Sequence, residues 1–229
     1  MNIKDEEYRY ERKFLFSSLD TFTFKDIIFQ IPFEVKEIFN PRKVNSIYFD
    51  TQNYQLARSS LDGNFKKYKV RLRYYDDIEL VDNLFLEIKL KEGLIGKKYR
   101  LLIKKDELLK NNMSISFLIN NEFIPFEINN IIMDLKPVLF VSYLREYYVS
   151  KSENIRFTFD RSIEFKNAEI CNLITKCEHQ FFSKFDKNIL EMKYPISKDK
   201  FANKFTKKIY SRLSTCSKYL IGLNQLDII

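Results

Sequence analysis

Eight segments of this chain alternate apolar and polar side chains, and this pattern restricts the fold more than any other feature of the sequence. The segments are Tyr8–Phe16, Val44–Phe49, Lys66–Tyr75, Leu84–Lys91, Lys97–Lys104, Val138–Val149, Ile155–Phe159 and Lys187–Tyr194. A period of two residues is typical of a β-strand with one apolar and one polar face. Asn, Asp, Gly or Pro residues bound most of the segments, as turns require. The sequence therefore predicts a β-rich protein.

Helical patterns lie between and after these segments. We expect a helix over residues 17–32, from a Ser/Asp cap to Pro32, and a short one in "PFEVKEIF", residues 32–39. Short helices are also expected in "KDELLK" and "FEINNIIMDLK", and a long one from Ser197 to about Gly222. No fixed repeat and no linker is evident, so we expect one domain over residues 1–229. The predicted class is α+β, and eight strands suffice to close a small barrel.

Charge and cysteine content restrict the partners and the compartment. The formal charge of +8 favours an anionic partner, although a lysine-rich surface that serves solubility would give the same total. The three cysteines form no disulfide framework, and Cys171, Cys177 and His179 fit no common zinc pattern. The opening "MNIKDEEYRYERK" is polar, and no apolar run approaches the length of about 18 residues that spans a bilayer. We therefore expect a cytoplasmic protein without a signal peptide or a membrane span.

Three of the predicted strands carry the same charged pair, a glutamate followed two residues later by a lysine. The pairs are Glu11 with Lys13, Glu87 with Lys89, and Glu191 with Lys193. Further basic residues alternate in the same way along these and other strands, namely Lys69, Arg71, Arg73, Lys91, Arg145 and Arg156. A solvated outer face would explain any single strand. It explains less well a design that recurs on six segments, with cations in excess.

If the strands close into a barrel with these faces inward, the interior is a cationic tunnel. Such a tunnel is self-repelling, because two unit charges about 4 Å apart interact by about 4 kcal/mol at an effective dielectric near 20. Phosphate groups would relieve this repulsion, since arginine binds them through two parallel hydrogen bonds and lysine as a point charge. Glutamates among phosphates can hold Mg²⁺ or Mn²⁺. The pattern therefore predicts phosphate binding assisted by a divalent cation.

An ordered series of short motifs runs along almost the whole chain. It consists of "YERK", "SIYFDT", "VRLRYY", "LEIK", "SYLREYY", "IRFTFD", "LEMKYP" and "SKYLIGL". In this order the chain resembles the VTC domain, the polyphosphate polymerase domain of the vacuolar transporter chaperone complex and of its stand-alone bacterial relatives. The resemblance implies the triphosphate tunnel metalloenzyme fold, an eight-stranded antiparallel tunnel with surrounding helices. It also implies a metal-dependent enzyme that transfers the terminal phosphoryl group of ATP to orthophosphate or polyphosphate.

The resemblance also implies roles for individual residues. The basic residues that bind phosphate in catalysis would be Lys13, Arg71, Arg73, Lys89, Arg145 and Arg156, and the metal ligand would be Glu191. Ser217 and Lys218 match the family's Ser-Lys pair, and Lys69, Lys91 and Lys193 are expected to bind substrate from the same strand faces. Glu11 and Glu87 are the additional metal candidates. Thr215 and Cys216 depart from the basic and aromatic residues that often precede Ser-Lys, and Arg212 could compensate.

Three other functions compete with the polymerase. A triphosphatase of the same fold would hydrolyse triphosphates, and a non-catalytic module would only bind polyphosphate or nucleotide. The broader tunnel family often begins with Glu-x-Glu-x-Lys, and Arg9 at the first position favours the polymerase branch. Nucleic-acid binding is not expected, because the basic residues are spread over strands and no RNA-binding signature occurs. The expected partners are ATP, orthophosphate and polyphosphate.

Overall fold

The computed structural model describes residues 9–17, 21–29, 34–93, 95–150, 152, 154–168, 182–207, 209 and 211–229. The strands are β1 (Arg9–Ser17), β2 (Val35–Asp50), β3 (Lys66–Tyr75), β4 (Asn83–Glu92), β5 (Ile95–Lys104), β6 (Lys136–Ser150), β7 (Ile155–Asn167), β8 (Ser183–Phe185) and β9 (Lys187–Pro195). The helices are α1 (Thr21–Phe29), α2 (Gln55–Leu61), α3 (Lys105–Lys110), α4 (Phe126–Asn129), α5 (Asp199–Thr206) and α6 (Lys218–Gln225). Short 3-10 helices are η2 (Ile78–Leu80), η3 (Ser116–Leu118), η4 (Ile132–Asp134) and η5 (Ile196–Lys198).

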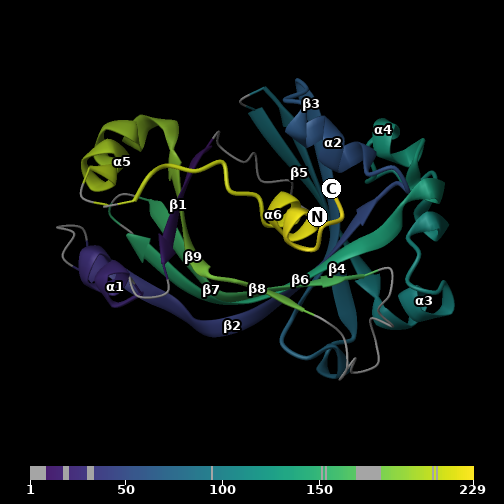
Figure 1. Cartoon of the computed structure of the whole chain (residues 1–229), viewed down its shortest axis with the longest axis horizontal. Helices are drawn as coiled ribbons and strands as arrows, with labels where there is room; N and C mark the ends of the chain where they lie inside the picture. The colour runs from purple at the N-terminus through teal and green to yellow at the C-terminus, as the bar shows by residue number, and fades with distance from the viewer. Residues whose placement is uncertain are drawn as a thin grey trace. The chain divides into compact units, whose positions relative to one another are not determined.

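The strands form one nine-stranded sheet (Figure 1). Their hydrogen-bonded order is β1-β9-β7-β6-β2-β3-β4-β5, and β8 pairs with β7. The pairs β1–β9, β7–β9, β2–β3, β3–β4 and β4–β5 are all antiparallel. The predicted α+β class with an antiparallel sheet is therefore confirmed. In the described part of the chain the order ends at β1 and β5, so the sheet is not a closed barrel.

The backbone divides into two compact units. Unit 1 comprises Met1–Arg42, Tyr143–Ile163 and Lys184–Cys216, and unit 2 comprises Lys43–Ser142, Glu164–Ser183 and Ser217–Ile229. Strands β2, β6, β7 and β8 contribute residues to both units. The single domain over residues 1–229 stays a prediction. No helix in the described ranges has the length and apolar character needed to cross a membrane.

The core of unit 1 lies on one face of β1, β7 and β9. Phe14, Phe157 and Leu190 are buried there, because the period of the strand sends alternate side chains to the same side. The helix α5 lies beside β9 and adds Ala202 and Phe205 to this core (Figure 1). The charged side chains between the apolar ones therefore project from the opposite face of these strands.

Unit 2 follows the same rule with a larger core. Leu72, Leu86 and Ile88 of β3 and β4 are buried under residues of α3, η3, α4 and η4, among them Leu108 and Ile132. Figure 1 shows α2 beside β3, and residues of these two elements are in contact. Residues of α3 and β5 are also in contact. Burial of these apolar side chains stabilises the unit by about 25 cal/mol for each Å² removed from water. The alternate residues of β3, β4 and β5 form a second charged face.

One predicted helix is absent from the structure, and one short strand was not predicted. The short helix expected over residues 32–39 is wrong, because the described residues from Val35 onward belong to β2, which begins well before Val44. Val35, Ile38 and Phe39 suit a strand, and sheet pairing outweighs their helix-like spacing. The three-residue strand β8 was not predicted. The other strands, α1 and α3 lie within the predicted segments or overlap them.

The continuous C-terminal helix is also wrong. The structure has α5, an extended segment and then α6. The extended segment binds to β1, where Leu213 pairs with Phe14 and the Ser214 amide donates to the Lys13 carbonyl at 2.9 Å. These hydrogen bonds replace the intrahelical bonds that a continuous helix would have made. The predicted helix around residues 218–222 is confirmed as α6.

Gly222 gives α6 its close approach to the core of unit 2. A Cβ atom added at this position would lie 2.6 Å from Phe165 Cδ1 and 2.7 Å from Leu139 Cδ2. We expect Gly222→Ala to destabilise the protein by about 1–3 kcal/mol, since overpacking forces buried side chains to shift. Urea denaturation of the variant beside the wild type measures this cost. Equal midpoints would show that α6 is not held as closely as the structure indicates.

Candidate functional site

The first charged face lies in unit 1 and comprises Glu11, Lys13, Arg145, Arg156, Asp160, Glu191 and Lys193. The strand register places Lys193 of β9 between Glu11 of β1 and Arg156 of β7. Two residues earlier on β9, Glu191 lies opposite Lys13 of β1 on one side and Thr158 of β7 on the other. Acids and bases therefore alternate between β1 and β9, and β7 adds Arg156 and Thr158 beside them. The Glu-x-Lys spacing on β1 and on β9 produces this pattern because the two strands run antiparallel.

Two carboxylates and two ammonium groups of this face are close together. Lys13 Nζ lies 2.8 Å from Glu11 and 3.9 Å from Glu191. Lys193 Nζ lies 2.6 Å from Glu191 and 3.6 Å from Glu11. Burial alone would raise the pKa of Glu191, but Lys193, Lys13 and Arg145 hold it well below its ordinary value. Burial would likewise lower the pKa of Lys13, whereas Glu191 and Glu11 raise it.

Arg145 is held by a buried carboxylate. Its Nε and Nη2 atoms donate to the two oxygens of Asp160 at 2.5 and 2.7 Å, and Asp160 is fully buried. The guanidinium also lies 5.1 Å from the ring centre of Tyr143. Burial by itself would lower the pKa of Arg145, but Asp160 and Tyr143 raise it, so the group stays charged. Arg145 is therefore a cation with a fixed orientation.

The second charged face lies in unit 2, on β3, β4 and β5. It comprises Lys69, Arg71, Arg73, Glu87, Lys89, Lys91, Lys98 and Arg100. The register places Arg71 opposite Glu87 and Lys69 opposite Lys89, while Arg100 and Lys98 of β5 face Glu87 and Lys89. These seven basic side chains share the face with one acid, and the register places Lys67 and Lys104 on it as well. Like charges that face each other destabilise a sheet unless an anion compensates them.

Glu87 is the buried centre of this face. Arg71 donates to its Oε2 atom through Nε at 2.9 Å and Nη2 at 2.8 Å, and Lys98 donates to Oε1 at 2.5 Å. Arg73 and Arg100 lie 3.6 and 3.8 Å away. Burial would raise the pKa of Glu87, but Arg71, Arg73 and Lys98 lower it far below its ordinary value. Glu87 therefore orients the basic residues around it.

We expect Glu87→Gln to reduce stability at neutral pH by about 3 kcal/mol, because it removes one partner from a buried charge cluster. The carboxylate has a pKa below the ordinary 4.5 in the folded protein. Its stabilising effect is therefore complete above about pH 4.5 and is lost as the pH falls below that value. Urea denaturation at pH 7 and pH 3.5 should show a smaller difference between variant and wild type at the lower pH. A difference that does not depend on pH would contradict this role.

The first turn of α6 joins the second charged face. Lys69 Nζ donates to Ser217 Oγ at 2.9 Å. Burial alone would raise the pKa of Tyr48, but Arg71, Arg73 and Lys218 lower it. Arg71 Nη1 donates to the Tyr48 hydroxyl at 3.0 Å. The Tyr48 ring stacks on that of Tyr219 at 4.9 Å. Ser217 thus lies beside a basic residue of β3, while the substrate-binding role of Ser217 and Lys218 stays a prediction.

Tyr219 attaches α6 to a second buried carboxylate. Its hydroxyl donates to Asp50 Oδ2 at 2.5 Å. Asp50 is fully buried and also accepts hydrogen bonds from the amides of Thr51, Leu56 and Ala57. Tyr48 and Asp50, both in "SIYFDT", therefore hold Arg71 and α6 in place beside the second charged face and are not themselves among its basic residues. The sequence reasoning did not identify their role.

The carboxylate oxygens of the first charged face are the type of ligand that a divalent cation such as Mg²⁺ or Mn²⁺ binds. Mg²⁺ and Mn²⁺ prefer oxygen ligands, and Mg²⁺ is usually bound by one or two carboxylates together with waters and substrate phosphates. Glu11 and Glu191 share the same two lysines and so lie close enough to act together. The described residues contain no cluster of three or more His, Cys, Asp or Glu that could hold a metal. Glu87 is surrounded by cations, and its assignment as a metal ligand stays a prediction.

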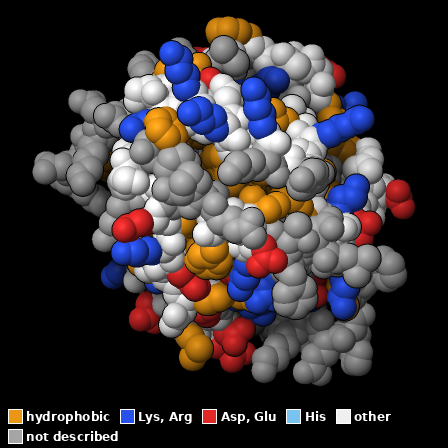
Figure 2. Space-filling view, turned by 90° about the vertical axis from the view of Figure 1, so that its left-hand side faces the viewer, with side chains coloured by type: hydrophobic (Ala, Val, Ile, Leu, Met, Phe, Trp, Pro, Cys, Tyr) orange, Lys and Arg blue, Asp and Glu red, His pale blue; other side chains and the backbone are white. Residues whose placement is uncertain are grey.

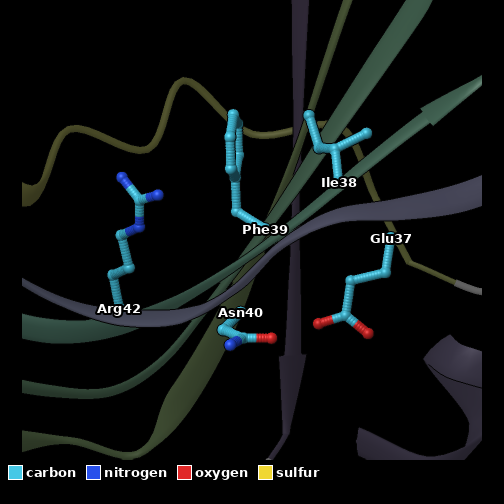
Figure 3. Close-up of a pocket in the computed structure, with 5 residues that line it drawn as sticks. All are labelled: Glu37, Ile38, Phe39, Asn40 and Arg42. Carbon is cyan, nitrogen blue, oxygen red and sulfur yellow. The ribbon is translucent and has the colours of Figure 1, made fainter.

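A hollow lies elsewhere, along the first half of β2 in unit 1. Glu37, Ile38, Phe39, Asn40 and Arg42 line it. Figure 3 shows Ile38, Phe39 and Arg42 on one side of the strand and Glu37 and Asn40 on the other. The Arg42 guanidinium covers the Phe39 ring at 4.7 Å. None of the predicted site residues lines this hollow.

Sequence reasoning overlooked Lys98 and Arg100, although both alternate with apolar residues in "KKYRLLIK". Arg212 is exposed, and its compensating role stays a prediction. Cys171, Cys177 and His179 lie outside the described residues. Figure 2 shows several Lys and Arg side chains gathered in the upper part of one face, in keeping with the net charge of +8.

Comparison with known proteins gives a family and a fold. The family model described as "VTC domain" matches residues 8–227. A crystal structure of a "putative adenylate cyclase" from Vibrio parahaemolyticus is similar, with 11% identity, a TM-score of 0.52, and coverage of 94% of this chain and 98% of that one. A "putative adenylate cyclase" from Bacillus halodurans has 16% identity, a TM-score of 0.51, and coverage of 91% and 95%. A search of curated proteins gave no match. The two structures show the fold alone.

Proposed function

Because the chain belongs to the VTC domain family, we propose that it is an ATP-dependent polyphosphate polymerase. The observation that carries this proposal is the second charged face, where the basic side chains named above share the strands with a single buried acid, Glu87. A face of this composition favours a ligand with several negative charges along its length. Polyphosphate and the triphosphate of ATP are such ligands. Magnesium or manganese is the proposed cofactor, and the cytoplasm is the proposed location.

The proposed phosphate-binding residues fall into two groups, one in each unit. In unit 2 they are Lys69, Arg71, Arg73, Lys89, Lys91, Ser217 and Lys218. In unit 1 they are Lys13, Arg145, Arg156 and Lys193. Arg71 and Arg145 are oriented by Glu87 and Asp160, so their guanidinium groups need little reorganisation when phosphate binds. Arg156 is exposed and has no ion-pair partner in the described part of the chain, so its charge is available to a ligand.

The proposed metal ligands are Glu11 and Glu191. A divalent cation held there would neutralise charge on phosphate oxygens when bound. Lys13 and Lys193 would then exchange a carboxylate for a phosphate oxygen, and both are charged for this purpose because nearby carboxylates raise their pKa values. The carboxylates therefore hold the lysines in position before substrate arrives.

The reaction needs alignment and charge neutralisation more than proton transfer. An oxygen of orthophosphate or of the growing chain attacks the γ-phosphorus of ATP, and the bond from that phosphorus to the bridging oxygen of ADP breaks. The attacking oxygen is already anionic, so no strong general base is required. The arginines and lysines stabilise the charge that spreads over the three equatorial oxygens. ADP leaves with the bridging oxygen, and the chain is longer by one phosphate.

Incubation of the pure protein with ATP and Mn²⁺, followed by gel electrophoresis and orthophosphate assay, tests this function. A polymerase yields ADP and long polyphosphate in proportion. A triphosphatase of the same fold yields orthophosphate instead. Tight binding of tripolyphosphate without any turnover indicates a module that only binds. Either of the last two results would overturn the polymerase.

A further inference from the structure

Thr158 carries a buried hydroxyl without a partner in the first charged face. It lies on β7 between Arg156 and Asp160, and the apolar residues Phe157 and Phe159 point the other way into the core. Its Oγ1 atom is buried and makes no hydrogen bond with any residue that the structure describes. Buried hydroxyl groups in folded proteins nearly always have a partner, so the exception calls for an explanation.

Stability does not explain this hydroxyl. An unsatisfied buried hydroxyl destabilises the folded state, because the group loses its hydrogen bonds to water on folding. Valine has nearly the same shape as threonine, suits a strand equally well and has no polar atom to satisfy. A threonine at this position therefore costs stability compared with valine.

The residue across the strand pair from Thr158 is Glu191. Side chains directly opposite in an antiparallel pair have Cβ atoms about 4.5–5.5 Å apart, within reach of a hydrogen bond between a hydroxyl and a carboxylate. Glu191 is now paired with Lys193 at 2.6 Å and lies 3.9 Å from Lys13. The partners of the Glu191 carboxylate are thus the same two lysines that bind phosphate in the proposed function.

We propose that Thr158 is a positioning residue whose hydroxyl donates to the Glu191 carboxylate when Lys13 and Lys193 turn to a bound phosphate chain. This inference rests on the proposed function, because it requires those lysines to exchange partners. Beside any cation that Glu191 holds, the carboxylate oxygen that the two lysines leave needs a replacement donor. A threonine hydroxyl supplies one by rotation about a single bond, without movement of the backbone. The hydroxyl of Thr158 is then without a partner in the free protein and donates to Glu191 only when phosphate is bound.

Two matched variants separate this role from a structural one. Thr158→Val keeps the shape and removes the donor, whereas Thr158→Ser keeps the donor. Without ligand we expect Thr158→Val to melt at the wild-type temperature or above it. Its dissociation constant for tripolyphosphate, measured by calorimetry, should rise about 10-fold, as loss of a hydrogen bond to a charged group implies. Thr158→Ser should bind within about 3-fold of the wild type.

The outcomes decide between the two proposals separately. If the wild type binds tripolyphosphate but makes no polyphosphate, the polymerase fails and the two variants still test Thr158. Equal affinity of Thr158→Val and the wild type overturns the role of Thr158. Loss of both stability and affinity in Thr158→Val also overturns it, because a structural residue would behave in this way. A wild type that does not bind tripolyphosphate overturns the inference together with the phosphate site.

Discussion

Arg71→Ala should lower the rate of ADP release by about 100-fold or more, since loss of one donor to developing charge commonly costs this much. Three hydrogen bonds fix the Arg71 guanidinium, two to Glu87 and one to Tyr48. Glu87 keeps Lys98, Arg73 and Arg100 within 4 Å in the variant, so the fold should survive. Turnover of ATP and circular dichroism measure the two expectations.

The matched control for this variant is Arg58→Ala. Arg58 is exposed on α2 of the same unit, and its removal changes the net charge by the same amount. It should leave turnover within about 2-fold of the wild type, as is usual for surface substitutions. Arg71→Lys keeps the charge but loses the planar fork, and it should remain at least about 10-fold impaired. Wild-type turnover by a folded Arg71→Ala would remove Arg71 from the site.

Arg145→Ala should reduce the free energy of unfolding by about 3–5 kcal/mol, the usual cost of leaving a buried charge unpaired. Asp160 is fully buried and receives two hydrogen bonds from Arg145. Removal of the guanidinium leaves this carboxylate without its principal partner. Urea denaturation at pH 7 measures the loss.

Arg156→Ala provides the contrast, because Arg156 lies on the same charged face but is exposed. Its stability should stay within about 0.5 kcal/mol of the wild type, while its affinity for tripolyphosphate falls. The double variant Arg145→Met, Asp160→Leu should regain most of the lost stability, since apolar residues can replace a buried ion pair. It should not regain activity. Equal stability of Arg145→Ala and Arg156→Ala would contradict the burial of the ion pair between Arg145 and Asp160.

Much of the fold could be predicted from alternation alone. Lys66–Tyr75 was predicted with the bounds that the structure gives to β3, because Val70 and Leu72 alternate with Arg71 and Arg73 along a strand buried on one side. The first half of β2 was not predicted. Its side chains are nearly all exposed, so the sequence there has no alternation of apolar and polar residues. The segment around Leu213 was not predicted either. Its extended form depends on hydrogen bonds to β1, almost 200 residues earlier in the chain.

The sequence allowed us to predict which charged residues belong to the site, but not which acid pairs with which base. The Glu-x-Lys spacing indicated that Glu191 and Lys193 share a face, and the structure places them there in an ion pair. Which carboxylate would hold which cation depends on register and on strand order, and neither can be obtained from one sequence. The bond between Arg145 and Asp160 is local to a strand pair, whereas the attachment of Tyr219 to Asp50 joins distant segments. Long-range attachments of this kind have no signal in the spacing of residues.

The central claim is that basic residues on the strand faces bind a chain of phosphates. A crystal structure with tripolyphosphate and Mn²⁺ tests it most directly. We predict phosphate oxygens within hydrogen-bond distance of Arg71 and Lys89 on the second charged face, or of Arg145 or Arg156 on the first. Tripolyphosphate found only in the hollow beside Phe39 and Arg42, or on neither charged face, would contradict the claim.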